Sequence, residues 1–138
     1  MSRKNIATIF LAILLCLASF SAAYANDAKI LAADFLKTGD NRWSISVTLK
    51  HEDTGWDHYA DKWRIVDADN NILGERVLFH PHVNEQPFTR SLDDVMIPED
   101  ITIIYIEAHD KVHGWTPARL KADIAESRDG RLRIEAKY

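Results

Sequence analysis

The sequence predicts an all-β fold, an antiparallel β-sandwich of the immunoglobulin-like type with seven or eight short strands. After residue 25 the apolar side chains alternate with polar ones at a period of two, and no segment sustains the spacing of an amphipathic helix. Turn-forming residues separate the alternating segments at intervals of roughly ten residues, which is typical of sandwich strands. A small closed barrel is the alternative architecture.

Two segments carry the clearest strand signals. Residues 43–49 alternate aromatic or aliphatic side chains with hydroxyl side chains, which predicts a half-buried strand. Residues 101–109 are mostly β-branched or aromatic and form the strongest strand of the chain. The other strands are expected over residues 29–35, 62–66, 72–79, 88–92, 119–124 and 132–134. The polar composition of residues 125–138 also allows a loose tail in place of the last strand.

The first 25 residues have the three parts of an export signal peptide. A basic start precedes an apolar core at residues 9–20, and Ala23-Tyr24-Ala25 is a small-x-small cleavage site. Cleavage there leaves residues 26–138 as a single domain, because a chain of this length forms one core. We therefore expect a periplasmic or secreted protein.

Two other interpretations of the first segment are a membrane anchor and a lipoprotein signal. The apolar core is much shorter than the roughly 20 residues that span a bilayer, which disfavours an anchor. Cys16 follows the bulky Leu15, whereas a lipid-attachment cysteine normally follows a small residue. We therefore expect no membrane contact after cleavage.

The composition of the mature domain excludes several classes of function. Cys16 is the one cysteine of the chain, so the mature domain has no disulfide and no thiolate, and its core must hold it together. Cleavage leaves 15 basic and 21 acidic residues, a net charge near −6. This excess of negative charge disfavours binding to nucleic acid and to anionic membranes.

All six histidines lie between residues 51 and 113, and they occur as three pairs. Each pair lies at the end of a predicted strand or in the loop beside it: His51 with His58, His80 with His82, and His109 with His113. Because the loops of a sandwich gather at its two ends, we expect several of these rings to meet. In an extended chain, residues two apart point to one face, so the rings of His80 and His82 should lie together.

Clustered imidazoles indicate a site for Zn(II) or Cu(II). A blue-copper centre is excluded, because that centre requires a cysteine thiolate. The sequence predicts one shared site formed by His80, His82, His109 and His113, with His58 close enough to join them. The protein is then a histidine-rich carrier or buffer of metal, and its partner is the metal ion or a periplasmic protein.

A purely structural role for the histidines is the other interpretation of this pattern. The spacing matches no fixed ligand code, and acidic residues lie near each pair. The imidazoles then stabilise loops by hydrogen bonding to those carboxylates, which belong to Asp53, Asp57, Glu85 and Asp110.

Three runs resemble those of a family of small, uncharacterised exported bacterial proteins. The runs are GWDHYADKW at residues 55–63, HPHVNEQPFTR at residues 80–90 and AHDKVHGW at residues 108–115. The resemblance covers roughly residues 45–124. It implies export and a shared fold, and it implies no particular activity.

Two tryptophans provide the alternative function, a metal-free interaction module. Trp56 and Trp115 fall in predicted loops, where aromatic side chains can line a groove for a peptide, a glycan or a protein partner. The sequence has no nucleophile elbow, no phosphate-binding loop and no dinucleotide fingerprint. We therefore expect that the protein is not an enzyme.

Overall fold

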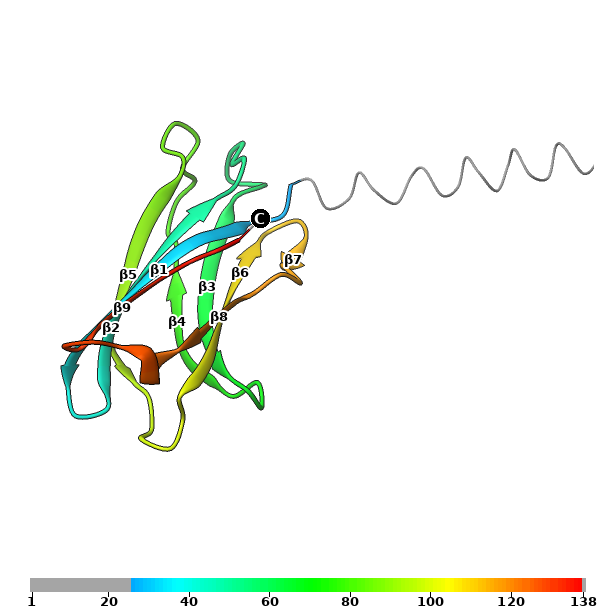
Figure 1. Cartoon of the computed structure of the whole chain (residues 1–138). Helices are drawn as coiled ribbons and strands as arrows, with labels where there is room; N and C mark the ends of the chain where they lie inside the picture. Colours follow the sequence, from blue (N-terminus) through cyan, green and yellow to red (C-terminus); the bar gives the residue numbers. More distant parts are fainter. Residues whose placement is uncertain (1–25, 138) are drawn as a thin grey trace, which may run out of the picture.

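The computed structural model describes residues 26–137 and shows two antiparallel β-sheets packed face to face (Figure 1). The prediction of an all-β antiparallel sandwich is confirmed. Within the described residues the one helical segment is a 3-10 turn at Ile124–Glu126. A helix that could cross a membrane is not found among residues 26–137. The predicted signal peptide, residues 1–25, lies outside the described residues.

Each sheet is continuous and antiparallel in its pairing. The first sheet has the order β5 (Phe88–Met96), β2 (Arg42–Lys50), β1 (Lys29–Gly39), β9 (Arg131–Glu135). The second has the order β4 (Ile72–Val77), β3 (Ala60–Asp67), β6 (Ile103–Asp110), β7 (Gly114–Trp115), and β8 (Leu120–Asp123) also pairs with β6.

The alternating pattern of the sequence decides which side chains enter the core. In β2 the odd-numbered residues from Trp43 to Leu49 are buried, and the hydroxyl side chains between them face outward. Those hydroxyls pair with strand β5, as in the 2.7 Å contacts of Ser46 with Ser91 and of Thr48 with Thr89. In β6 the even-numbered residues face the core instead. This parity determines which histidines and carboxylates reach the interior.

The expected strand over residues 132–134 is present as β9, so this part of the C-terminal segment is not a loose tail. Strand β9 pairs with β1, and its apolar residues Leu132 and Ile134 pack against the core. A turn at Asp129 and Gly130, both with positive φ, brings the segment back to the sheet. Within residues 26–137 the sandwich has nine strands: the eight expected segments each contain one, and the two-residue β7 is the addition.

One end of the sandwich gathers all the loops that contain histidine (Figure 1). Strands β2, β4 and β6 end there, and β1, β3, β5 and β7 begin there. The loops at this end cover residues 51–59, 78–87 and 111–113, and residues 26–28 enter the fold beside them. The topology thus brings segments that are distant in sequence to one place.

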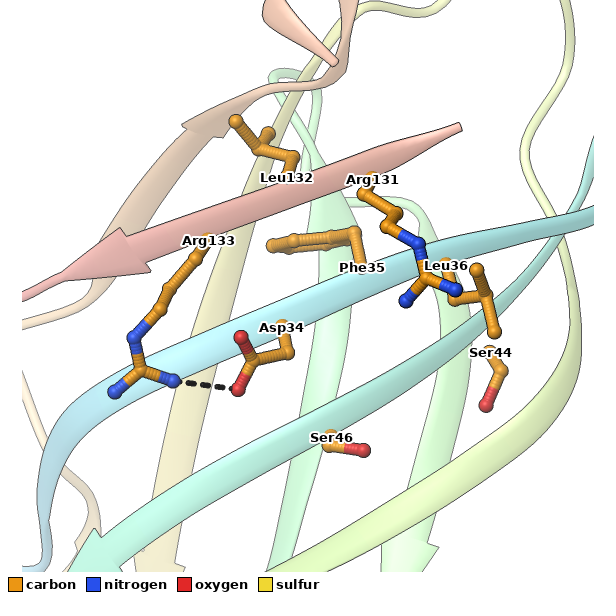
Figure 2. A pocket seen from close by; sticks show the side chains of 8 residues that line it. All are labelled: Asp34, Phe35, Leu36, Ser44, Ser46, Arg131, Leu132 and Arg133. Atoms are coloured by element: carbon orange, nitrogen blue, oxygen red, sulfur yellow. Dashed lines mark hydrogen bonds and ion pairs between the residues drawn. The ribbon is translucent and has the colours of Figure 1, made fainter. Parts of the chain in front are cut away.

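A shallow hollow of about 460 Å³ lies elsewhere, on the outer face of β1, β2 and β9 (Figure 2). Ser44, Ser46 and Arg131 help to line it, and Asp34 forms a 2.7 Å ion pair with Arg133 at its side. Both paired side chains are about half exposed, so water screens their attraction. No histidine lines this hollow, which therefore lies outside the candidate site.

Candidate metal centre

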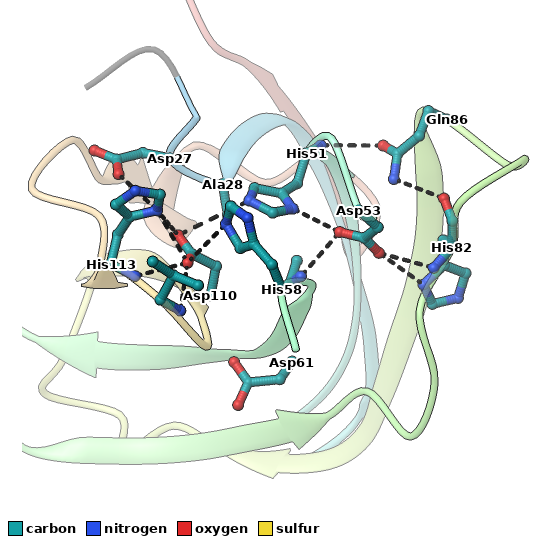
Figure 3. A network of polar contacts seen from close by, with 12 residues as sticks. Asp27, Ala28, His51, Asp53, His58, Asp61, His82, Gln86, Asp110 and His113 are labelled. Carbon is teal, nitrogen blue, oxygen red and sulfur yellow. Dashed lines mark hydrogen bonds and ion pairs between the residues drawn. The ribbon is translucent and has the colours of Figure 1, made fainter. Parts of the chain in front are cut away.

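The carboxylate of Asp110 lies among three imidazoles at the histidine-rich end (Figure 3). Asp110 is the last residue of β6 and continues the inward-facing row of that strand, so its side chain is fully buried. Nε2 of His51 lies 3.9 Å from Oδ2, and Nε2 of His58 lies 3.3 Å from Oδ1. Nδ1 of His113 lies 3.1 Å from both oxygens. Three nitrogens thus surround one buried anion.

The turn after β6 keeps Asp110 ionised despite its burial. The backbone N–H groups of Val112 and His113 donate to Oδ1 at 2.9 and 2.8 Å. Burial alone raises the pKa of Asp110, but these hydrogen bonds and the contact with the His113 ring outweigh it and lower the pKa below 3.8. An ionised carboxylate is the form that binds a metal ion.

His51 has a buried ring nitrogen without a hydrogen-bond partner. Its side chain is fully buried, because the residue continues the inward-facing row of β2 by one step past Lys50. Nδ1 lies 2.6 Å from Oδ1 of Asp53 and donates its proton there, since a carboxylate only accepts. Nε2 has no partner and faces the carboxylate of Asp110. A lone pair that faces a carboxylate oxygen at 3.9 Å is unfavourable, and a proton or a metal ion on Nε2 relieves this repulsion.

His58 presents a second nitrogen of the same kind. Its Nε2 is buried without a hydrogen-bond partner, although the ring as a whole is 18% exposed. The ring makes edge contacts with those of His51 and His113, at centroid distances of 4.8 and 5.2 Å. The three imidazoles are therefore contiguous, and His58 and His113 form the more exposed side of the cluster.

Asp53 holds His51 in place and connects the loops around it. Its Oδ1 accepts hydrogen bonds from His51 and from the backbone N–H of Ala60, the latter at 3.0 Å. Its Oδ2 accepts from the backbone N–H of His82 at 2.8 Å. A carboxylate that binds the second nitrogen of a histidine is the usual support of a metal-ligating imidazole. The same side chain fixes the start of β3 and the loop 78–87.

The spacing of these atoms fits a divalent metal ion. The ligand atoms of His51, His58 and Asp110 all lie within 4.8 Å of one another. Zinc bonds of about 2.0–2.1 Å place tetrahedral ligands roughly 3.3–3.4 Å apart. The distances from Asp110 to His58 and His51, 3.3 and 3.9 Å, need only small shifts to meet that geometry. Imidazole nitrogen and carboxylate oxygen suit both Zn(II) and Cu(II).

Of the five predicted metal ligands, the structure places two, His58 and His113, at this centre. His109 lies on the opposite face of β6 from Asp110, because neighbouring residues of a strand point to opposite faces. Its Nδ1 lies 2.6 Å from Asp61, and its ring contacts the edge of Trp115. His109 and His113 therefore do not share the cluster around Asp110.

His80 and His82 form a neighbouring pair outside the ligand cluster. Their ring centroids lie 4.6 Å apart, and the ring of His82 stacks on Phe88 at 3.9 Å. Nε2 of His82 lies 2.9 Å from the guanidinium of Arg90. Burial lowers the pKa of His82 below 6.5, and the charge of Arg90 lowers it further. His82 is linked to the centre through Asp53 and does not face Asp110.

The two tryptophans of the interaction-module alternative lie in different environments. Trp56 is 63% exposed at the loop 51–59 and contacts Tyr59 edge-on. Trp115 lies in β7, and the guanidinium of Arg64 covers its ring at 3.7 Å. Stacking on Trp115 would require this cation to move. Of these two tryptophans, only Trp56 presents a large free aromatic surface.

The sequence prediction missed His51 and Asp110 as ligands, although a signal for each was present. Each residue extends the inward parity of an alternating strand by one position. Asp27 precedes β1 and Asp53 follows β2. Both lie in irregular segments, where no periodicity indicates the direction of a side chain. Their contacts with His51 and His113 depend on loop geometry.

Comparison with known proteins yields one informative relative. A protein of Halomicrobium mukohataei named "Putative lipoprotein" is 36% identical over 89 residues, which is 64% of this chain and 43% of that protein. The chain therefore spans less than half of the length of this relative. No family model matches the chain, and no solved structure matches it.

Proposed function

We propose that this is an exported protein that binds a divalent metal ion, Zn(II) or Cu(II), through His51, His58 and Asp110. The observation that supports this most strongly is the fully buried Nε2 of His51, which has no hydrogen-bond partner and faces an ionised carboxylate. A metal ion satisfies that nitrogen, the Nε2 of His58 and the carboxylate at once. The protein acts as a carrier or buffer of the ion.

The charge of the centre favours a cation. Three carboxylates, those of Asp27, Asp53 and Asp110, are at least 89% buried around imidazoles that are neutral when they bind metal. Buried anions without a compensating charge are costly, and a dication supplies that charge. A metal ion binds the deprotonated form of its ligands, so metal binding competes with protons and weakens as the pH falls.

Export is supported by two independent features. The first 25 residues combine a basic start, an apolar core and a small-x-small cleavage site. The relative from Halomicrobium mukohataei carries the name of a lipoprotein, which is a protein of the cell envelope. We propose a periplasmic or secreted location, where a carrier meets metal ions from outside the cell.

Metal binding by the purified mature protein tests this function directly. With Zn(II) at pH 7.5, we expect competition against a chromophoric chelator to show tight binding by the wild-type protein. His51→Ala and His58→Ala should each weaken that binding by more than tenfold, since supporting groups alone contribute 10–100-fold to affinity. His109→Ala is the matched control, because this histidine faces the opposite side of β6.

Circular dichroism separates a binding defect from unfolding. His58→Ala leaves the buried pair of His51 and Asp53 in place, so this variant should keep the β-sheet spectrum of the wild-type protein. Zn(II) binding that is equal in wild-type, His51→Ala and His58→Ala proteins would contradict the assignment. Absence of binding to both Zn(II) and Cu(II) would contradict the proposed function, and Trp56 would become the first residue to test for partner binding.

A further inference from the structure

We infer that the centre holds two divalent ions, with the carboxylate of Asp110 as the bridge between them. This inference rests on the proposed function and specifies its stoichiometry. Two groups of ligand atoms are present among the described residues, and they share Asp110. One contains His51 and His58, and the other contains Asp27 and His113.

The second group has its own geometry. Nδ1 of His113 lies 3.1 Å from Asp110 and 3.8 Å from Oδ1 of Asp27. These separations are comparable to those of the first group, 3.3 and 3.9 Å. The three ligand atoms lie within 4.8 Å of one another, and they combine one imidazole with two carboxylates. Such a set suits Zn(II) or Cu(II) as the first group does.

The two groups lie on different sides of Asp110. Figure 3 shows Asp27 and His113 on one side of this residue and His51 on the other. The backbone N–H groups of the turn both donate to Oδ1, whereas Oδ2 accepts only from the ring of His113, whose proton a metal ion of the second group would replace. Oδ2 lies 3.1 Å from Nδ1 of His113 and 3.9 Å from Nε2 of His51. One oxygen is thus placed to contact an ion in each group.

The residues of the second group are held by the fold. Asp27 precedes β1, and the hydroxyl of Thr116 donates to the carbonyl of Ala28 at 2.8 Å, which ties this segment to the chain after β7. His113 is placed by the turn that Asp110 caps. Both ligands therefore come from anchored backbone.

Charge and access favour a second ion on the outer side. The three carboxylates of the centre exceed the charge of one dication, so a first ion leaves attraction for another. The side chains of Asp27 and His113 are 11% and 30% exposed, whereas those of His51 and Asp110 are fully buried. Asp27 also lines a surface hollow of about 380 Å³. The outer ion therefore exchanges more readily than the inner one.

Electron paramagnetic resonance during a titration with Cu(II) tests the bridge. Ions in carboxylate-bridged pairs lie roughly 3.5–4 Å apart, and two Cu(II) ions at that distance couple magnetically. We expect the first equivalent to give the spectrum of an isolated Cu(II). The second equivalent should bind as well but lower the integrated signal below two spins per chain and produce a half-field transition.

Asp27→Asn provides the matched test of the second group. This variant should bind one Cu(II) per chain and keep an uncoupled spectrum, whereas Asp57→Asn, an exposed residue of the loop 51–59, should behave like the wild-type protein. Binding of one ion by the wild-type protein, or of two uncoupled ions, would overturn the inference and leave the proposed function intact. Binding of no ion would overturn both.

Discussion

Asp53→Ala is expected to lower the free energy of unfolding of the metal-free protein by at least about 3 kcal/mol, because three buried donors lose their acceptor. The substitution leaves three donors without their acceptor: the ring of His51 and the backbone N–H groups of Ala60 and His82. Each buried donor without a partner costs about 1–3 kcal/mol. Urea unfolding monitored by tryptophan fluorescence measures the change.

Asp57→Ala is the control for this prediction, because Asp57 is an exposed residue of the same loop. An exposed substitution of this type should change the free energy of unfolding by less than about 0.5 kcal/mol. If Asp53→Ala were as mild as Asp57→Ala, the carboxylate would not organise the loops, and the support of His51 would have to come from elsewhere.

Asp110→Asn is expected to abolish measurable binding of Zn(II), with a loss of affinity greater than about 100-fold. Even the supporting groups of metal ligands contribute 10–100-fold, and Asp110 contacts every imidazole of the centre. The amide keeps an oxygen that can accept the backbone hydrogen bonds of Val112 and His113, so the turn should survive. Isothermal titration calorimetry of the purified protein gives the affinity.

Glu52→Gln removes one acidic charge from the same end of the sandwich, but at an exposed side chain. Its affinity for Zn(II) should stay within about twofold of the wild-type value, because solvent screens exposed charges. Equal losses in Glu52→Gln and Asp110→Asn would mean that overall negative charge attracts the metal, without a defined ligand at Asp110.

The fold follows from the sequence because each strand repeats its signal several times. Three or more inward-facing residues occur in each of two rows, Trp43 to Leu49 and Ile104 to Ala108. A single residue that departs from the alternation therefore does not obscure the two-residue period of the strand. The tail was harder to predict, because Leu132 and Ile134 alternate with charged residues and are only partly buried. Pairing with β1, a contact distant in sequence, orders this segment.

The site was predicted less completely because histidine spacing does not give the direction of a ring. His109 and Asp110 are adjacent, yet they point to opposite faces of β6. Continuing the inward-facing row of β6 by one position predicts that Asp110 faces the interior and that His109 does not. The same continuation of the row of β2 predicts that His51 faces the interior. The roles of Asp27 and Asp53 required the folded loops, because their partners lie in other segments of the chain.

The most direct test of the metal centre is the response of individual histidine nitrogens to Zn(II) in ¹⁵N-labelled protein, followed by two-bond proton–nitrogen correlation spectra. We predict that Nε2 of His51 and His58 shifts to metal-bound values while Nδ1 of His51 keeps its proton to Asp53. The resonances of His80 and His109 should not move. Shifts at His80 and His109 with none at His51 and His58 would contradict the account.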